Sequence, residues 1–345
     1  MIPSSALITV GEPQEKIAQA RAGKIPSTEL VSMLDSGMFG RVLTMSDRGM
    51  DASKMSVCTR FAADAYCRTW DAENVYLAEE FPGIQYLAVH AALGRLPLRR
   101  RRRVVMLVHN VASIKRRVLL TPLTWAADHL LCLSEGSKAD LVSKYGVAAS
   151  RVTVVGSRVD TRFFQPTPTA PQKLQICSAG AINRDYDTLI KATEGLGVAV
   201  KVAADTAWGY SMGGKSLRGD KPLPDHVEMR SWGTYEALRA LYAESRVIVV
   251  PLARTMMSGV TVALEGMAMG KPVILTHNPY VEDFLEEGVS GLFVRASDPD
   301  ALRTKLRHLL DHPDEAERLG ARAREWVAER FSVEAYVRKI VSAFA

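Results

Sequence analysis

A serine, a glycine and a glutamate lie in one segment whose residue types suit binding of a phosphate and a diol. Val247–Thr276 has the pattern of a strand, a loop, a helix that stops at Gly270, and a second strand, with Ser258 and Gly259 opening the helix. Free N–H groups at a helix start attract anions, and a glycine there lets a phosphate approach the backbone. Glu265 follows about 9 Å along the helix axis, where a carboxylate could accept both hydroxyls of a ribose. The simpler alternative is that Ser258 caps the helix and Glu265 lies on the surface.

In the first half of the chain, two polar or glycine-containing sites come directly after apolar runs. His109 comes directly after the aliphatic run Val104–Val108, and Gly11 and Glu12 come directly after the first apolar run. Open α/β sheets bind ligands at the carboxyl ends of their strands, so these residues are candidates for ligand contact. A histidine at such a position can also be a structural residue.

The elements that would position these residues are short apolar runs alternating with helical patterns along the whole chain. Each run is aliphatic or β-branched and is separated from the next by enough residues for a crossover, which is typical of parallel strands in a doubly wound α/β sheet. The runs predict two sheets of similar design. The predicted strands are Ala6–Val10, Asn74–Leu77, Val104–Val108, His129–Leu133 and Val152–Val155, then Leu174–Ser178, Val198–Ala203, Val227–Met229, Arg246–Pro251, Pro272–Thr276 and Gly291–Val294.

A proline-rich segment separates the two predicted sheets. Thr161–Lys173 contains Pro166, Pro168 and Pro171, which suits a linker better than a strand or a helix interior. The sequence therefore predicts an N-terminal domain over residues 1–160, a linker over 161–173 and a C-terminal domain over 174–330. The chain then ends in helical patterns, with residues 331–345 reaching back to the first domain. The predicted late helices are Ala301–Asp311, Asp314–Arg330 and Ser332–Phe344.

The composition excludes several classes of protein. With 345 residues, 47% hydrophobic and 24% charged, the chain has the profile of a globular protein large enough for two domains. It lacks an apolar run of about 18 residues and a signal-peptide pattern, so we expect a cytoplasmic protein. The four cysteines form no C-x-x-C pair and the histidines lack ligand spacing, so we expect neither a disulfide framework nor a metal site.

The net charge of +6 arises in the first half of the chain. Residues 1–172 hold 22 Lys and Arg against 15 Asp and Glu, whereas residues 173–345 hold 22 against 23. An unbroken basic run contains Arg99, Arg100, Arg101, Arg102 and Arg103. Together with the apolar stretch Phe81–Leu98, this run could bind an acceptor or lie on an anionic membrane surface, at about 1 kcal/mol per basic residue near the lipid. The alternatives are a solvated loop and a nucleic-acid surface. The run contains no aromatic residues that could stack on bases, which makes nucleic acid the weaker alternative.

Three segments carry a family resemblance. Leu264–Ile274 reads LEGMAMGKPVI, Ala127–Glu135 reads ADHLLCLSE, and Val152–Phe164 reads VTVVGSRVDTRFF. They resemble the signature elements of the family 4 retaining glycosyltransferases of GT-B fold, and the likeness covers residues 104–345 well and 1–103 poorly. It implies two Rossmann-like domains with a cleft between them. It also implies transfer of a sugar from a nucleotide-diphosphate sugar to an acceptor hydroxyl, with retention of configuration and without a metal.

The resemblance also implies roles for individual residues. Glu265 would hold the donor ribose, and the backbone amides of Ser258–Thr261 would face the diphosphate. Leu174–Ala192 is similar to the family's strand, glycine loop and helix, where Arg184 would neutralise the diphosphate unless it pairs with a neighbouring aspartate. The implied donor-binding residues are Gly180, Arg184, Arg230, Trp232, Met257, Ser258, Gly259, Val260, Thr261 and Glu265, and the implied catalytic residues are His109, Arg184 and Glu265.

Further positions follow from the same resemblance. Histidine 109 matches a residue that lines the sugar pocket, which implies contact with the donor sugar or the transition state. Val227–Thr234 matches the segment that packs the nucleobase, although Trp232 could equally be a core residue. The expected partners are a UDP-, GDP- or other nucleotide sugar and a carbohydrate or lipid-linked acceptor. No other cofactor and no nucleic acid are expected.

The chain departs from the family pattern at two positions. Ala181 stands where the family has an arginine after the glycine, and Met257 stands where it has the first glutamate of E-x7-E. A thioether cannot accept hydrogen bonds from sugar hydroxyls as a carboxylate does. These residues predict altered recognition of the sugar. They leave open a nucleotide-sugar binder without turnover, and a sugar-nucleotide epimerase or hydrolase.

Overall fold

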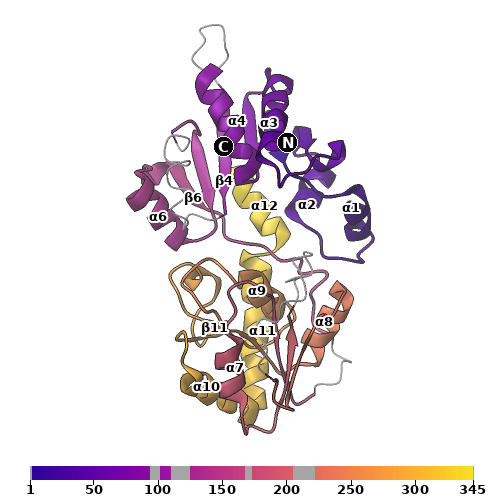
Figure 1. Ribbon diagram of the computed structural model, residues 1–345, viewed down its shortest axis with the longest axis vertical. Coiled ribbons are helices and arrows are strands. Elements are labelled where there is room, and N and C mark those ends of the chain that lie inside the picture. Colours follow the sequence, from indigo (N-terminus) through magenta and orange to yellow (C-terminus); the bar gives the residue numbers. More distant parts are fainter. Residues whose placement is uncertain (1, 94–101, 110–124, 168–172, 205–221, 345) are drawn as a thin grey trace. The chain divides into compact units, whose positions relative to one another are not determined.

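The protein has two compact units, each built around one parallel sheet (Figure 1). The computed structural model describes residues 2–93, 102–109, 125–167, 173–204 and 222–344. Unit 1 contains Met1–Ala22, Ser27–Gly156 and Glu334–Ala345, and unit 2 contains Gly23–Pro26 and Ser157–Val333.

Unit 1 has a six-stranded sheet in the order β2-β1-β3-β4-β5-β6, with every neighbouring pair parallel. Its strands are β1 Ile2–Thr9, β2 Phe39–Thr44, β3 Asn74–Leu77, β4 Arg103–Val108, β5 His129–Cys132 and β6 Val152–Val154. Its helices are α1 Gln14–Arg21, α2 Glu29–Asp35, η1 Ser46–Arg48, α3 Met55–Arg68, α4 Glu80–Leu93, α6 Glu135–Tyr145 and η2 Ala149–Arg151, with α12 Val333–Ser342 from the end of the chain.

The sequence predicted every strand of unit 1 except β2, although β1 begins at Ile2 and not at the predicted Ala6. This strand pairs only with β1 and forms an edge of the sheet. Gly40 and Arg41 are exposed, and only the two terminal residues of the strand are fully buried. Because Gly40 and Arg41 interrupt its apolar residues, β2 lacks the aliphatic run by which the other strands were identified.

Unit 2 has a second six-stranded parallel sheet, in the order β12-β11-β10-β7-β8-β9. The strands are β7 Gln175–Ala179, β8 Ala199–Ala203, β9 Val227–Arg230, β10 Val247–Val250, β11 Val273–Thr276 and β12 Leu292–Val294, all of which the apolar runs predicted. The helices are α7 Tyr186–Thr193, α8 Tyr235–Glu244, α9 Val260–Ala268, η3 Glu282–Phe284, α10 Pro299–Asp311 and α11 Pro313–Arg330.

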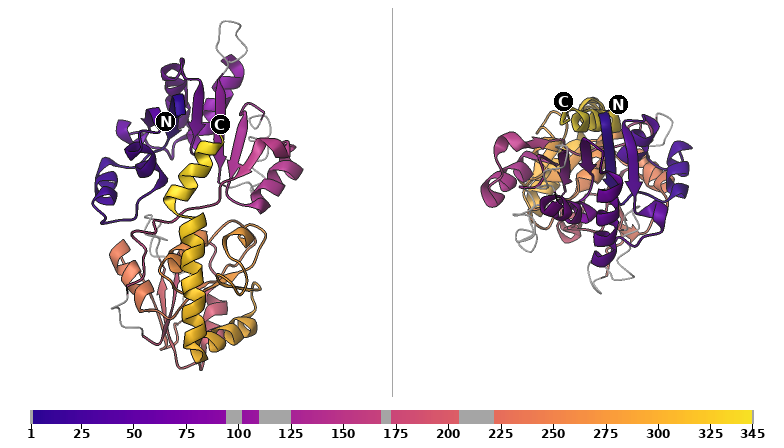
Figure 2. Two further views of the ribbon diagram at one scale, coloured as in Figure 1. Left: turned by 180° about the vertical axis from the view of Figure 1, so that it is seen from behind. Right: turned by 90° about the horizontal axis from the view of Figure 1, so that it is seen from above.

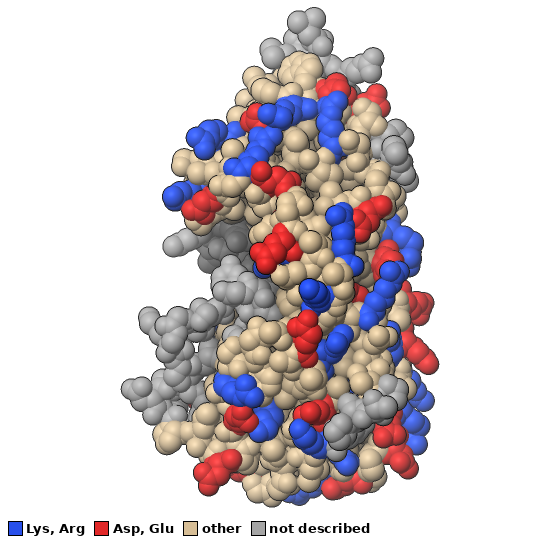
Figure 3. All heavy atoms as spheres, turned by 90° about the vertical axis from the view of Figure 1, so that its right-hand side faces the viewer, with Lys and Arg blue, Asp and Glu red and all other residues tan. Residues whose placement is uncertain are grey.

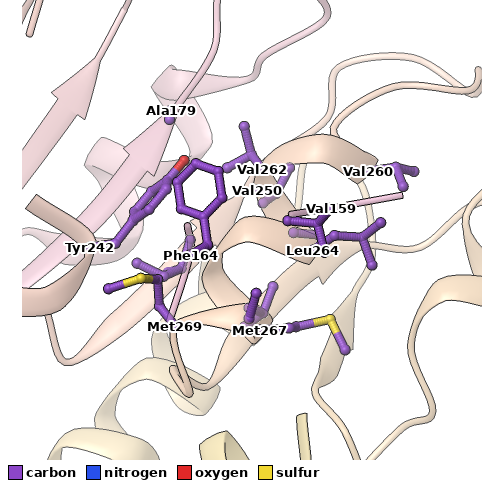
Figure 4. Packing of buried hydrophobic residues seen from close by; sticks show 14 of the residues in the cluster. Val159, Phe164, Ala179, Tyr242, Val250, Val260, Val262, Leu264, Met267 and Met269 are labelled. Carbon is purple, nitrogen blue, oxygen red and sulfur yellow. The ribbon is translucent and has the colours of Figure 1, made fainter. Parts of the chain in front are cut away.

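Both faces of this second sheet are buried. Ile248 and Val250 of β10 join one apolar cluster, and Val247 and Val249 join the other. Successive side chains of a strand point to opposite faces, so a sheet with helices on both sides needs a continuous apolar run. Figure 4 shows part of the first cluster, where the ring of Tyr242 from α8 lies beside Phe164.

The predicted linker begins inside this cluster. Phe163 and Phe164 are 5% and 1% exposed. Arg324 of α11 also donates hydrogen bonds to the carbonyl oxygens of Thr161 and Phe164, at 2.8 and 2.9 Å. These aromatic side chains attach the start of the segment to the core of unit 2.

The end of the chain belongs to unit 1. Helix α11 ends at Arg330, and α12 begins at Val333, close to the boundary between the predicted helices Asp314–Arg330 and Ser332–Phe344 (Figure 2). The Phe344 ring packs edge-on against Phe39 and Tyr76 of unit 1, with centroids 6.1 and 6.3 Å away. The last helix is thus part of the first folding unit, although it follows the second in sequence.

Candidate functional site

The loops after β7 and β10 meet because these two strands are neighbours in the sheet. They run parallel, with Val247 opposite Ile176 and Ile248 opposite Cys177, so their carboxyl ends lie at the same edge. The loop after β7 carries Arg184, and the loop after β10 leads to Ser258. The structure thereby brings together two residues that are 74 positions apart.

Arg184 is held by oxygen atoms from both loops. Its Nε donates to the Ala179 carbonyl at 2.8 Å, and its Nη1 donates to the Ile182 carbonyl at 2.7 Å and to Ser258 Oγ at 3.4 Å. Asp185 instead caps α7 by accepting from the Thr188 amide at 3.0 Å. These hydrogen-bond partners of the guanidinium are neutral. Burial lowers the pKa of Arg184, while the charge of Glu265 acts in the opposite direction.

Gly180 makes room for this guanidinium, and Gly259 lies beside it. A Cβ on Gly180 would lie 2.5 Å from Nη2 of Arg184, and one on Gly259 would lie 3.7 Å from Nη1. Gly259 also has φ +79°, and its added Cβ would lie 2.6 Å from Val250 Cγ1. Gly180 has φ +95°, so the backbone conformation favours glycine at both positions, and at Gly259 a side chain would also collide with Val250.

Helix α9 begins beside Arg184 without a capping side chain. Gly259 is its N-cap residue, and its first turn contains no acidic residue. The Ser258 hydroxyl donates to the Ile182 carbonyl at 3.3 Å, so the alternative in which Ser258 caps this helix is wrong. The first amides of α9, those of Val260 and Thr261 among them, and the guanidinium together form a positively charged site suited to a phosphate.

Glu265 lies on α9 and is buried, with 5% of its surface exposed. Its Oε2 accepts a hydrogen bond from the Tyr242 hydroxyl at 2.9 Å. Burial raises the pKa of Glu265 to about 7, while the Tyr242 hydrogen bond and the Arg184 charge act in the opposite direction. The alternative in which Glu265 is a surface residue is therefore wrong. Sequence reasoning missed Tyr242, because it lies on another helix.

The residues expected at the nucleobase lie at the end of β9 and directly after it, at the edge of the same sheet. The Arg230 guanidinium lies 4.0 Å from the centroid of the Trp232 ring, and its Nε contacts Glu228 Oε1. Trp232 is half-buried and packs against the apolar cluster that contains Tyr242, as does Met257. Trp232 thus contributes to the core while part of its surface stays exposed.

Unit 1 places His109 directly after β4, next to a buried glutamate. Glu80 Oε1 accepts from the His109 backbone amide at 2.9 Å, and Glu80 Oε2 lies 3.3 Å from His109 Nδ1. The neighbouring Glu79 accepts from the Thr9 hydroxyl at 2.7 Å and from the Val10 amide at 3.0 Å. Sequence reasoning missed both glutamates, although they come soon after a predicted strand, where polar residues signal a ligand-binding edge.

Gly11 is fixed by its surroundings at the end of β1. It has φ +79°, and an added Cβ would lie 2.6 Å from Ser46 Oγ and Thr44 Cβ. The Glu12 carbonyl accepts from the Ser46 hydroxyl at 3.0 Å. The loop predicted to contact an acceptor is therefore held against the end of β2.

The expectation of a surface basic run is wrong for Arg102. This residue is 4% exposed, and its guanidinium donates to the Tyr86 hydroxyl and to the carbonyls of Thr69 and Ala72. Arg103 belongs to β4. Residues 82–87 of the apolar stretch are also buried, so they cannot lie on a membrane. The buried hydroxyl and carbonyl oxygens need a hydrogen-bond donor, which Arg102 supplies. Arg99, Arg100 and Arg101 lie outside the described residues.

The described part of the chain has neither a helix able to span a membrane nor a metal-binding cluster. No helix there is long and apolar enough to cross a bilayer. No group of three or more His, Cys, Asp or Glu side chains in the same residues could hold a metal ion. On the face shown in Figure 3, basic and acidic side chains are interspersed.

Residues 160–326 match the family model described as glycosyl transferases group 1. The chain is 27% identical over 221 residues to MMP alpha-(1->4)-mannosyltransferase of Mycolicibacterium hassiacum, covering 62% of this chain and 53% of that protein. It is 28% identical over 290 residues to the putative colanic acid biosynthesis glycosyltransferase WcaL of Salmonella typhimurium, covering 78% and 70%. The matches thus span 53% and 70% of the length of these two relatives.

Solved structures share the fold across nearly the whole chain. Sucrose-phosphate synthase of Thermosynechococcus elongatus superimposes with a TM-score of 0.72 at 16% identity, covering 99% of this chain and 98% of that one. Anabaena HepE in complex with UDP superimposes with a TM-score of 0.71 at 13% identity, covering 98% of both chains. With two six-stranded parallel sheets, this chain has the GT-B fold, and its residues 160–326 resemble the glycosyl transferases group 1 family.

Proposed function

We propose that this protein transfers a sugar from a nucleotide-diphosphate sugar to an acceptor hydroxyl, with retention and without a metal. In the reaction, the bond between the anomeric carbon and the donor phosphate breaks, and a bond to the acceptor oxygen forms on the same face of the sugar. The leaving diphosphate takes the proton of the acceptor hydroxyl. Such a hexosyltransferase would act in the synthesis of a glycan, a glycolipid or a polysaccharide.

The contact between Arg184 and the start of α9 carries this proposal. The guanidinium lies 3.4 Å from Ser258 Oγ and next to Gly259, whose helix begins without a capping side chain. Charge grows on the leaving diphosphate during transfer, and preorganised donors that face this charge are usually the largest source of rate enhancement. Glu265 lies on the same helix, where its carboxylate would accept the ribose hydroxyls.

A uridine or guanosine diphosphate sugar is the proposed donor. One relative is a GDP-mannose-dependent alpha-(1-6)-phosphatidylinositol monomannoside mannosyltransferase of Mycobacterium tuberculosis, and the Anabaena HepE structure contains UDP. The backbone near Arg230 and Trp232 would pack against the base. Met257 would give the sugar an apolar neighbour in place of the family's carboxylate.

The acceptor in this proposal is a carbohydrate or a lipid-linked carbohydrate, bound by unit 1. Gly11 and Glu12 would contact it, and His109 would contact the donor sugar or the transition state. A lipid-linked acceptor would place the protein in the cytoplasm, at the inner face of the cell membrane. Arg99, Arg100 and Arg101 would then supply the positive charge at that surface.

A nucleotide-sugar binder without turnover is the second candidate, since Ala181 is buried where the family has an arginine. Met257 removes a further polar group from the same site. An epimerase or hydrolase is a related possibility, which would consume the donor in the absence of any acceptor.

Thermal unfolding against a panel of nucleoside diphosphates and nucleotide sugars, without added metal, tests the donor site. A ligand at about 100 times its Kd adds about 2.7 kcal/mol to the stability of the folded state, which gives a readable shift in Tm. We expect a shift with one nucleotide that is lost in Arg184→Ala and Glu265→Ala. Arg254→Ala, an exposed arginine in the loop before α9, is the matched control and should keep the shift.

Either of two results would overturn the proposal. One is the absence of a shift with every nucleotide, and the other is an equal shift in the wild type and in Arg184→Ala. Release of nucleoside diphosphate that depends on an acceptor then separates a transferase from a hydrolase, while binding without release supports the second candidate.

A further inference from the structure

Two consecutive glutamates after β3 bind the ends of the two strands that flank it. In the sheet order, β3 lies between β1 and β4. Glu79 accepts two hydrogen bonds from the end of β1, at Thr9 and Val10. Glu80 binds His109 at the end of β4. The adjacent carboxylates therefore divide their contacts between the two neighbouring strands.

The contact with Glu80 determines which ring nitrogen of His109 carries the proton. The oxygen atoms of a carboxylate only accept hydrogen bonds. Both groups of His109 that contact Glu80 must therefore be N–H donors. The backbone amide meets Oε1 at 2.9 Å, and the ring nitrogen Nδ1 faces Oε2 at 3.3 Å. Nδ1 must therefore be protonated, and in the neutral ring Nε2 is then a hydrogen-bond acceptor.

The same contact also fixes the orientation of the ring. The Glu80 side chain is only 10% exposed, and it holds the backbone and the ring of His109 at once. The His109 side chain is 35% exposed, so a ligand can reach the imidazole. Because Glu80 contacts both the backbone amide and the ring of His109, it restricts the orientation of the ring more than a single contact would.

We propose that Glu80 is a positioning residue, which holds His109 in the Nδ1–H form so that Nε2 accepts a hydrogen bond from a sugar hydroxyl. The assigned tautomer of His109 rests on its two contacts with Glu80. The role of Nε2 in binding a sugar rests on the proposed glycosyl transfer. Glu80 acts through His109 and touches no reacting atom.

Glu80→Gln tests this assignment with almost no change in size. The amide of glutamine has one acceptor and one donor, so it cannot accept from both N–H groups of His109. When its oxygen accepts from the backbone amide, its NH2 group faces Nδ1, which must then lose its proton. The ring changes to the Nε2–H form, and the acceptor at Nε2 is lost.

The first measurement is the nitrogen NMR spectrum of the full chain with labelled histidine, at a pH where the imidazoles are neutral. His109→Gln assigns the His109 signals. We expect the Nδ1–H form in the wild type and the Nε2–H form in Glu80→Gln. Glu79→Gln is the matched control, because this neighbouring carboxylate binds β1, and it should leave the tautomer of His109 unchanged. An Nε2–H ring in the wild type, or an unchanged ring in Glu80→Gln, would overturn the inference.

The second measurement is the steady-state rate with donor and acceptor. Loss of the hydrogen bond between a sugar hydroxyl and the neutral Nε2 predicts that Glu80→Gln lowers kcat/KM for the donor about tenfold. Tm should be nearly unchanged, because the amide of glutamine still contacts both groups of His109. A tautomer change with unaltered kcat/KM would contradict the positioning role. If the wild type itself shows no turnover, the proposed function fails, and the tautomer result still decides what Glu80 does to His109.

Discussion

The hydroxyl of Tyr242 donates a 2.9 Å hydrogen bond to the carboxylate of Glu265, and both side chains are buried in unit 2. Tyr242 comes from α8 and Glu265 from α9. Because burial brings the pKa of Glu265 to about 7, this carboxyl group changes its charge near neutral pH. The Tyr242 hydrogen bond favours the ionised form, which is the form that would accept the hydroxyls of a ribose.

Tyr242→Phe should weaken the protein more at high pH than at low pH. The variant removes the donor that stabilises the Glu265 carboxylate, and a hydrogen bond to a charged group contributes about 1.5–3 kcal/mol. At pH 8 we expect a loss of this size in the free energy of unfolding, measured with urea. At pH 5.5, where the carboxyl group is protonated, the loss should be smaller. Equal losses at both pH values would show that the hydrogen bond does not depend on the charge.

Glu265→Gln should change how stability depends on pH. The folded-state pKa of about 7 lies above the ordinary value of 4.5, so the folded state prefers the protonated carboxyl group. The stability from this preference is complete below about pH 4.5 and is lost as the pH rises through 7. Relative to wild type, the variant should therefore gain up to about 3 kcal/mol between pH 5 and pH 8.

Urea unfolding of both proteins at pH 5, 6, 7 and 8 measures this difference. Glu79, whose pKa burial also raises to about 7, is present in both proteins and cancels in the comparison. A pH-independent difference would mean that Glu265 stays ionised across this range.

Gly259→Ala should both destabilise unit 2 and abolish nucleotide binding. The residue has φ +79°, and the added methyl group would lie 2.6 Å from Val250 Cγ1 and 3.0 Å from Leu252 Cδ2. Strain and overpacking together predict a loss of about 2–4 kcal/mol in the free energy of unfolding. Gly146→Ala is the control, because Gly146 has φ +70° with no atom within 4 Å, and it should cost about 1 kcal/mol. Similar losses in both variants would exclude the close contact as the cause.

Arg102→Lys should reduce stability without changing the affinity for anionic vesicles. The planar guanidinium bonds three buried oxygen atoms, of Tyr86, Thr69 and Ala72, and an ammonium cannot reproduce this geometry. We expect a loss of about 3 kcal/mol in the free energy of unfolding. Vesicle co-sedimentation of the folded variant should match the wild type. A stable variant with weaker vesicle binding would place Arg102 at the surface instead.

Local sequence patterns were sufficient wherever burial alone selects the residues. Val247–Val250 lies in the middle of a sheet with apolar clusters on both faces, so all four of its positions are aliphatic. β2 has the exposed residues Gly40 and Arg41 in its first half, so it could not be recognised from an apolar run. Gly259 was singled out from the sequence as a position where a phosphate could approach the backbone, and the structure shows that a Cβ there would lie 2.6 Å from Val250 Cγ1.

The contacts of the polar residues were decided by the order of the strands. Arg184 meets Ser258 because β7 and β10 are neighbours, and Glu80 meets His109 because β3 and β4 are neighbours. The basic run in the sequence likewise did not indicate that Arg102 is buried, where its guanidinium donates hydrogen bonds to buried oxygen atoms. An apolar run is a local property of the chain, whereas a hydrogen bond needs two groups within about 3 Å. Only the packing of the sheets brings such groups from distant parts of the sequence to that distance.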